Sequence, residues 1–416
     1  MNTFTIVFAI ALAAATATRL WLAWRHVRYI QAHRDQVPDS FSAQIDLPAH
    51  QRAADYSSAK TGLNAFGIVV DAALLLIFTL GGGFAALNSW AHVWFGSGLA
   101  GGVALIAAVM IVSAAVELPL NVYRVFGIET RFGFNKMSPM MFVTDLAKQA
   151  AVAALLGLPL VLAVLWMMGR MGEYWWFWVW LVWMGFNLFV LAFYPTFIAP
   201  LFNKFSPMQD GELKARIEAL LVKCGFRSQG LFVMDGSRRS SHGNAYFTGF
   251  GKAKRIVFFD TLLTRLEPGE IEAVLAHELG HFKMNHVVRR MAWTFAVSLA
   301  FLWVLGQLRD AAWFFEGLGV GVPAGDAMAL VLFFTIVPVF TFLLRPLLAM
   351  YSRKHEFEAD AYAARYTPAS ELAQALVKLY KDNATTLTPD PLHSAFYDSH
   401  PPAAARIAKL KLLAGT

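Results

Sequence analysis

Cysteine and charge are the two things that this sequence has little of. One of its 416 residues is a cysteine, Cys224, so an intrachain disulfide framework and a cysteine-rich zinc site are both excluded. Charged residues make up 15% of the chain, whereas soluble domains carry about 25%. Hydrophobic residues make up 57%. The composition therefore predicts a polytopic membrane protein, in which any bound metal is held by histidine and carboxylate side chains.

The positive net charge of +7 does not indicate a nucleic-acid partner. The sequence shows no groove-like alternation of basic and aromatic residues, and its Lys and Arg side chains collect between the apolar stretches. Basic loops of this kind are typical of membrane proteins, where they lie in the cytoplasm and meet anionic lipid. We therefore expect a lipid bilayer as a partner and no nucleic acid.

Seven apolar stretches approach the length of about 20 residues that a membrane helix needs. They lie near residues 3–24, 67–87, 98–118, 147–168, 174–198, 291–308 and 327–350. The first could be a cleaved signal peptide, since Ala15-Thr16-Ala17 resembles a cleavage site. However, no Lys or Arg precedes it and several follow it, which favours a retained helix.

Loop charges predict the orientation of these helices. Basic residues are abundant after the first, third, fifth and seventh stretches and scarce after the others. The N-terminus is then outside, and the C-terminus and the long polar insertions are cytoplasmic. We expect four regions: helices one to five in 1–201, a cytoplasmic metalloprotease region in 202–290, helices six and seven in 291–350, and a cytoplasmic C-terminal region in 351–416.

The cytoplasmic insertion mixes strands with a helix. Three short β-like runs, "LFVMD", "NAYFTGF" and "RIVFFD", are separated by Gly- and Ser-rich turns. The next segment, "EPGEIEAVLAHELGHFK", predicts a helix, with Pro268 near its start and glutamates in its first turns. The fold class is therefore mainly α: about seven transmembrane helices plus a cytoplasmic region with a small β-sheet.

The motif HELGH, residues 277–281, has the spacing of a zinc site. On a helix, His277 and His281 share one face, one turn apart, and can supply two ligands. Glu278 is adjacent, where it can act as a general base on the attacking water. The motif also arises by chance. Gly280 and the preceding "AVLA" favour a packed helix whose histidines face a cleft.

The third ligand should come from another segment, since a catalytic zinc takes three protein ligands. In residues 352–366, Glu356 and Asp360 are four apart and share a helical face, whereas Glu358 points elsewhere. A carboxylate of this face could complete the site, with Asp360 bonded to a ligand imidazole. The alternative is a solvated helix with ordinary ion pairs such as Arg353–Glu356.

Together these residues resemble the zinc-dependent CaaX prenyl protease family, the type I integral membrane metalloproteases. HELGH is followed about seventy-five residues later by E-x-x-x-D. Further segments resemble that family in its order and cover nearly the whole chain. They are residues 193–208, 240–263, 275–286, 347–363 and 396–407.

The resemblance implies a ring of seven helices around a chamber, one Zn²⁺ per chain, and hydrolysis of peptide bonds in peptide or protein substrates that are lipidated or hydrophobic. It makes Glu356 the third ligand and Asp360 its supporting neighbour. Asn244 and Ala245 would pair with an extended substrate as an edge strand. His400 would stabilise the oxyanion. The remaining implied residue is Arg406, which would support the site.

Some features depart from the family or leave alternatives open. Ala403-Ala404-Ala405 replaces an expected acidic residue, and "LLAGT" is no retention signal, which favours a bacterial inner membrane. An HtpX-like quality-control metalloprotease is the closest alternative function. A non-catalytic scaffold or transporter is more remote, because Glu278 is intact. For Asp71 and Glu117, within apolar stretches, we favour a helix pair and an interfacial position over a chamber wall.

Overall fold

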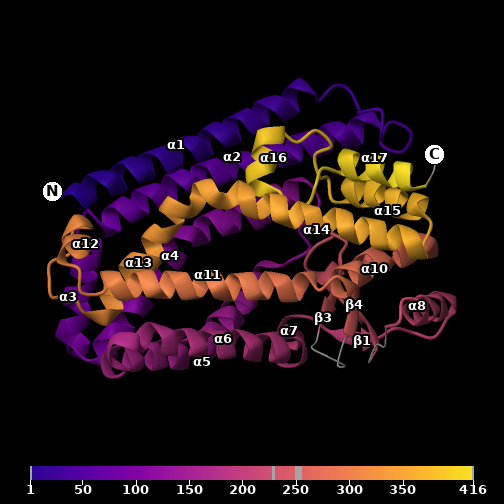
Figure 1. The fold of residues 1–416 in the computed structure, drawn as a ribbon. Helices are drawn as coiled ribbons and strands as arrows, with labels where there is room; N and C mark the ends of the chain where they lie inside the picture. Colours follow the sequence, from indigo (N-terminus) through magenta and orange to yellow (C-terminus); the bar gives the residue numbers. More distant parts are fainter. Residues whose placement is uncertain (1, 227–229, 249–254, 415–416) are drawn as a thin grey trace.

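The computed structural model describes residues 2–226, 230–248 and 255–414. Helices dominate, and within these ranges seven are long and apolar enough to cross a membrane (Figure 1). Their bounds are Thr3–Ala32, Leu47–Phe78, Leu99–Glu129, Pro139–Arg170, Gly172–Phe202, His286–Leu308 and Gly325–Tyr366. The number of expected membrane helices is thus confirmed, and each helix overlaps its expected apolar stretch.

The second membrane helix ends earlier than its apolar stretch predicts. Helix α2 (Leu47–Phe78) stops before the run Gly81-Gly82-Gly83. Gly82 has φ +79°, which side chains with a Cβ rarely adopt. The chain then turns and continues as a separate helix, α3 (Gly83–Phe95). Hydrophobicity alone did not show this break, because the residues on both sides of it are apolar.

The seventh membrane helix runs on into the polar segment that carries the expected third ligand. Helices α13 (Gly325–Thr341) and α14 (Arg345–Tyr366) follow one another through a single 3₁₀ turn, Phe342–Leu344. Pro338 precedes that turn, and Figure 1 shows α13 and α14 meeting at an angle there. Glu356 therefore lies on a helix that directly continues a membrane helix.

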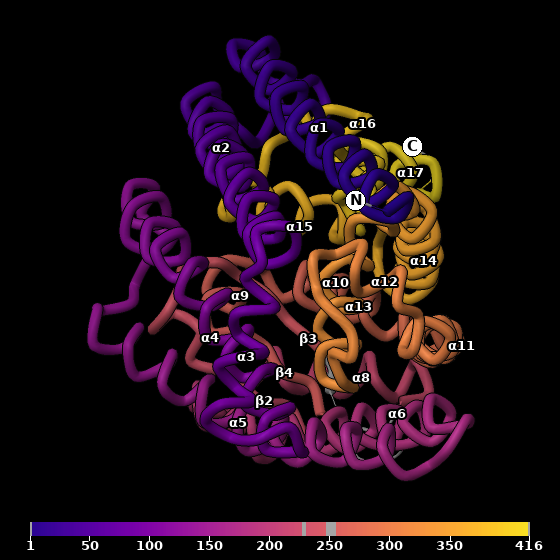
Figure 2. Tube along the Cα trace, turned by 90° about the vertical axis from the view of Figure 1, so that its left-hand side faces the viewer, coloured from indigo at the N-terminus to yellow at the C-terminus, as the bar shows by residue number. Residues whose placement is uncertain are grey.

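The long helices surround a cavity of about 1740 Å³, which we call the chamber. Side chains from every candidate membrane helix except Pro139–Arg170 line it. Figure 2, turned by 90° from Figure 1, shows the helices arranged around the middle of the molecule. The expected arrangement of helices enclosing a chamber is confirmed.

A four-stranded sheet lies at one end of the bundle. Its strands are β1 (Phe205–Pro207), β2 (Leu231–Met234), β3 (Ala245–Thr248) and β4 (Arg255–Phe259), in the order β1-β2-β4-β3. The β2–β4 pair is parallel and the other pairs are antiparallel. The three expected runs form strands, and β1 was not expected. Residues 249–254, part of the "NAYFTGF" run and its turn, lie outside the described residues.

Helix α10 (Pro268–Lys283) carries HELGH and packs against α14. Its start is fixed by a capping box between Glu267 and Glu270, with Pro268 at the first helical position. At Gly280 the two helices approach so closely that a Cβ would lie 3.0 Å from Cα of Ala359 and 3.1 Å from Cβ of Tyr362. The glycine between the two zinc-motif histidines therefore sets the distance between α10 and α14.

Candidate metal centre

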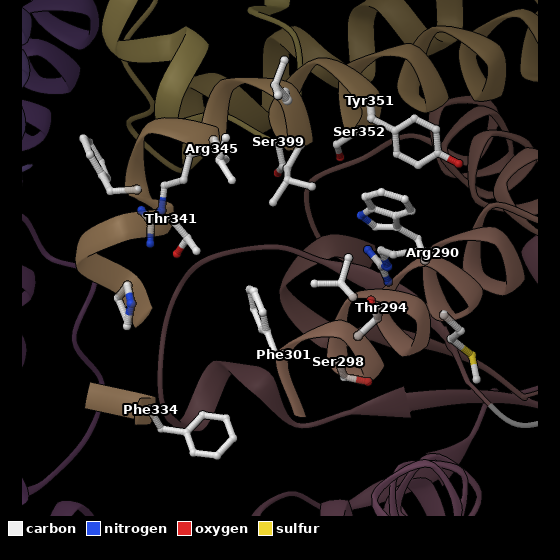
Figure 3. A pocket seen from close by; sticks show the side chains of 18 of the residues that line it. Arg290, Thr294, Ser298, Phe301, Phe334, Thr341, Arg345, Tyr351, Ser352 and Ser399 are labelled. Atoms are coloured by element: carbon white, nitrogen blue, oxygen red, sulfur yellow. The ribbon is translucent and has the colours of Figure 1, made fainter. Parts of the chain in front are cut away.

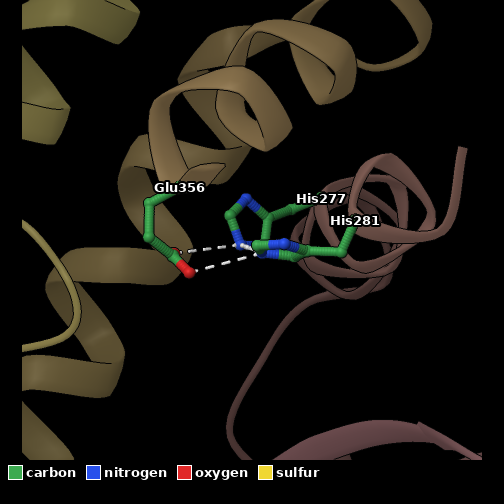
Figure 4. Close-up of side chains that lie close together, drawn as sticks. All are labelled: His277, His281 and Glu356. Atoms are coloured by element: carbon green, nitrogen blue, oxygen red, sulfur yellow. Dashed lines mark hydrogen bonds and ion pairs between the residues drawn. The ribbon is translucent and has the colours of Figure 1, made fainter. Parts of the chain in front are cut away.

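Helix α10 presents both motif histidines to the same point. Nε2 of His277 and Nε2 of His281 lie 3.3 Å apart, as the four-residue spacing predicts (Figure 4). The His277 ring is almost fully buried, and the His281 ring is partly buried. Two ring nitrogens that face each other at this distance suit a shared cation better than a hydrogen bond.

Helix α14 supplies the third group of the expected site. Oε2 of Glu356 lies 3.4 Å from Nε2 of His277, and Oε1 lies 3.3 Å from Nε2 of His281. In a tetrahedral zinc site with bonds of roughly 2.1 Å, ligand atoms are about 3.4 Å apart. Oε2 of Glu356 is buried, and its contacts with Nε2 of His277 at 3.4 Å and Nη1 of Arg406 at 3.5 Å are longer than ordinary hydrogen bonds. The spacing and the donor types fit a bound zinc.

His277, His281 and Glu356 form what we call the triangle. Asp360 and Arg406 lie behind it and hold His277 in place. Oδ1 of Asp360 is 2.9 Å from Nδ1 of His277. Arg406, on α17 (Ala403–Leu413), donates from Nε and Nη2 to the two oxygens of Asp360, at 2.9 and 2.6 Å. Asp360 is 1% exposed and Arg406 is 6% exposed, so this bidentate pair is fully enclosed.

The buried charges shift the pKa values of two of these groups. Burial alone lowers the pKa of His277, but the contacts with the Asp360 and Glu356 carboxylates outweigh it and raise the pKa to about 9. Burial also lowers the pKa of Arg406, and its hydrogen bond to Asp360 outweighs that effect and raises it. Without a cation in the triangle, His277 therefore takes up a proton at neutral pH.

Glu278 and His400 both line the chamber beside the triangle. The carboxylate of Glu278 has no hydrogen bond or ion pair to any other described residue, so it is available to a substrate or a water. Nε2 of His400 lies 3.4 Å from Oε1 of Glu356. The His400 side chain is 61% exposed, but that surface faces the chamber, and desolvation there lowers its pKa. Its ring is thus neutral at pH 7 and can donate one N–H.

Asn244 and Ala245 lie at the start of β3, which is the edge strand of the sheet on the side opposite β1. The carbonyl of Asn244 already accepts from the N–H of Phe259 on β4, at 3.0 Å. The backbone groups of the next residue, Ala245, point away from β4, toward the outer edge of the sheet. The N–H of Ala245 donates to Oδ1 of Asn244 at 2.8 Å. The next residue, Tyr246, lines the chamber. Among the described residues, the carbonyl of Ala245 therefore lies at the outer edge beside the site, whereas its N–H and the carbonyl of Asn244 already have partners.

Sequence reasoning missed a second cluster, formed by His286, His355 and Glu358, whose ligand-type atoms lie within 4.8 Å of one another. The signal was present in His286, which follows His281 by five residues, but that spacing does not share a helical face. Asp71 and Glu117 line the chamber, which is the interpretation we favoured less. Figure 3 shows further lining side chains from α11 (His286–Leu308), α13 and α14.

Two family models together match almost the whole chain. The first, described as CAAX prenyl protease N-terminal, five membrane helices, matches residues 26–204. The second, peptidase family M48, matches residues 207–414 and so includes the triangle of His277, His281 and Glu356. Peptidases of this family are metal-dependent, which agrees with the donor set of the site.

Individual relatives give the same result. A "CAAX prenyl protease 1 homolog" of Arabidopsis thaliana is 39% identical over 308 residues, 73% of this chain and 72% of that protein. "CAAX prenyl protease 1" of Saccharomyces cerevisiae is 32% identical over 408 residues, 92% of this chain and 90% of that protein. The crystal structure of S. mikatae Ste24p matches with a TM-score of 0.93 and 29% identity over 99% of both chains.

These matches favour the CAAX prenyl protease resemblance over the HtpX-like and non-catalytic alternatives. They agree in sequence, in fold and in the chain order of the motifs. The chain belongs to peptidase family M48 and is a multi-pass membrane metalloendopeptidase of the CAAX prenyl protease type.

Proposed function

We propose that His277, His281 and Glu356 bind one Zn²⁺ per chain. The observation that carries this proposal is the convergence of the donor atoms. Nε2 of His277 and Nε2 of His281 lie 3.3 Å apart, and the two Glu356 oxygens lie 3.4 Å from the first nitrogen and 3.3 Å from the second. Two imidazoles and one carboxylate leave one tetrahedral position open, as catalytic zinc sites do. When bound, zinc supplies a Lewis acid that polarises the scissile carbonyl and lowers the pKa of water to about 7.

The side chains around the triangle would divide the remaining chemistry. Glu278 takes the proton of the attacking water and passes it to the leaving amine. His400 donates its N–H to the oxygen that becomes negative as the carbonyl carbon turns tetrahedral. Asp360 keeps the proton of His277 on Nδ1, so that Nε2 stays free for the metal, and Arg406 keeps Asp360 ionised and in place.

We further propose that the substrate is an extended peptide that carries a lipid or a hydrophobic group near its C-terminus, as in a CaaX sequence. The free edge of β3 would add the peptide as a further strand through Ala245, with the Asn244 side chain beside it. The chamber supports a hydrophobic group because Phe301 and Phe334 line it (Figure 3). The relatives named CAAX prenyl protease support the same substrate class.

We propose that the protein lies in a bacterial inner membrane with its N-terminus outside the cytoplasm. The active-site segments and the C-terminus would then be cytoplasmic, as the distribution of basic loop residues favours. Cysteine accessibility mapping tests this orientation. Cys224 should react only after the cytoplasmic side is opened and the protein is denatured, because the thiol is buried, whereas a cysteine introduced at Arg365, which is exposed, should react without denaturation.

The substrate proposal is tested by mass spectrometry of a peptide panel incubated with the purified protein in detergent. The panel contains a farnesylated CaaX peptide, its unprenylated twin and unrelated hydrophobic peptides. We expect release of the last three residues of the CaaX peptide by the wild type and not by Glu278→Gln. Cleavage spread evenly over the unrelated peptides would contradict the proposed substrate class.

A further inference from the structure

Next to the metal triangle lies a cluster that the proposed mechanism does not use. His286 opens α11, and its side chain is 4% exposed. Nδ1 of His286 lies 3.0 Å from Nδ1 of His281. Nε2 of the same ring lies 2.9 Å from Oε2 of Glu358 on α14. The cluster is therefore joined directly to one of the three proposed ligands.

A second metal site is the first possibility that this cluster raises, and its geometry argues against one. The rings of His286 and His355 are stacked, with centroids 4.0 Å apart and planes 7° from parallel. The lone pairs of imidazole nitrogens lie in the ring plane, so those of two parallel rings cannot converge on one ion. Both nitrogens of His286 are also occupied already, by His281 and Glu358.

The hydrogen bonds allow one consistent direction from ligand to carboxylate. Nε2 of His281 faces the triangle, so a neutral ring must carry its hydrogen on Nδ1. The only partner that the described residues offer this N–H is Nδ1 of His286, which must then accept. His286 in turn carries its hydrogen on Nε2 and donates it to the Glu358 carboxylate.

We propose that His286 and Glu358 are positioning residues that fix the tautomer and orientation of His281 for metal binding. The inference rests on the proposed zinc site. Glu358 accepts from His286, His286 accepts from His281, and Nε2 of His281 is left with its lone pair toward the metal. A carboxylate at the end of such a chain makes the ligand imidazole a stronger donor.

The backbone between the two histidines makes the contact possible. Five residues on a continuous helix would place His281 and His286 on different faces. Helix α10 instead ends at Lys283, and Asn285 takes a left-handed conformation with φ 56°, which asparagine tolerates better than most residues. Helix α11 begins anew at His286 and returns its ring to His281.

Two carboxylates of α14, Asp360 and Glu358, therefore support the two histidine ligands in different ways. His277 meets the Asp360 carboxylate directly at 2.9 Å, whereas His281 reaches Glu358 through the ring of His286. Stacking on His355 holds the ring of His286 in the required plane. Glu356, two residues before Glu358 on α14, is the third proposed ligand.

The test is the zinc dissociation constant of metal-stripped protein in detergent, measured by competition with a chromophoric chelator. His286→Phe keeps an aromatic ring for the stack and removes the acceptor, and we expect a 10–100-fold weaker affinity. Glu358→Gln keeps an acceptor oxygen and should lose less. His355→Phe is the matched control, which keeps the stack and touches neither hydrogen bond, and should change the affinity by less than about twofold.

The double variant His286→Phe/Glu358→Gln shows whether Glu358 acts on His281 through His286 or independently of it. If Glu358 acts through His286, adding Glu358→Gln to His286→Phe weakens zinc binding no further. Absorption of bound Co²⁺ should keep its tetrahedral bands in every variant, because the three ligands are unchanged. A Glu358→Gln protein with the wild-type zinc affinity overturns the proposal even if His286→Phe does not fold. So does a second bound zinc that His355→Phe abolishes.

Failure of the underlying zinc site would look different. In that case the wild type binds no zinc, or Glu356→Gln binds it as tightly as the wild type. A wild type that binds zinc through Glu356 but is insensitive to His286→Phe retains the proposed metal site and contradicts only the positioning role of His286 and Glu358.

Discussion

Replacing Arg406 by methionine should destabilise the protein more than replacing Arg406 and Asp360 together. Arg406 supplies two of the three hydrogen bonds that Asp360 receives, at 2.9 and 2.6 Å, and Asp360 is 1% exposed. Arg406→Met therefore leaves a buried carboxylate with His277 as its one remaining donor. Breaking a buried ion pair by removing one partner costs about 3–5 kcal/mol.

The double variant Arg406→Met/Asp360→Asn removes the Asp360 charge as well. Glu356, whose Oε2 lies 3.5 Å from Nη1 of Arg406, is then the carboxylate that still lacks this partner. Replacing a whole buried pair by neutral residues is often nearly neutral for stability, so we expect the double variant to recover roughly 2 kcal/mol or more of the loss. Guanidinium unfolding of the metal-stripped protein in detergent, followed by tryptophan fluorescence, measures both losses in free energy.

Arg365→Met is the matched control, because Arg365 lies on the same helix as Asp360, is exposed, and makes no ion pair to the other residues described. It should change the unfolding free energy by no more than about 0.5 kcal/mol. The reasoning is refuted if Arg406→Met is as stable as this control. It is refuted equally if the double variant is less stable than Arg406→Met alone.

Three further predictions follow from the site. Glu278→Gln should bind zinc as the wild type does but cleave about 10²–10⁴-fold more slowly; normal cleavage would show that another group is the base. Because the pKa of His277 is raised to about 9 without metal, zinc must displace its proton below that pH. Affinity should then rise about tenfold per pH unit between pH 7 and 9, with a proton released that calorimetry in buffers of different ionisation enthalpy detects; a flat affinity would contradict the shift. Gly280→Ala gains about 1 kcal/mol of helix propensity but forces a Cβ to 3.0 Å from Ala359, at a cost of about 1–3 kcal/mol. It should thus be less stable than the wild type and weaker in zinc affinity, and an unchanged affinity would show that α10 and α14 tolerate separation.

The sequence predicted those parts of the site that depend on local spacing. His277 and His281 share a face because any α-helix places residues four apart together, and the structure confirms it. The same rule puts Asp360 beside Glu356 on α14. The pairing of α10 with α14 came from the family resemblance, since no local pattern joins segments about seventy-five residues apart.

What the sequence could not show depends on breaks in regular structure. The contact of His286 with His281 requires the left-handed turn at Asn285, and the spacing alone argued against it. The end of α2 at Phe78 was hidden in the same way by apolar residues on both sides of a glycine run. Asp71 and Glu117 reach the chamber because of how whole helices are rotated, which composition does not specify.

The most direct test of the zinc assignment is diffraction from crystals of the purified protein at wavelengths on both sides of the zinc absorption edge. We expect one anomalous difference peak per chain, about 2.0–2.2 Å from Nε2 of His277, Nε2 of His281 and a carboxylate oxygen of Glu356. A protein that retains zinc and shows its peak elsewhere, for instance between His286, His355 and Glu358, would contradict both the proposed ligands and the positioning role of His286 and Glu358.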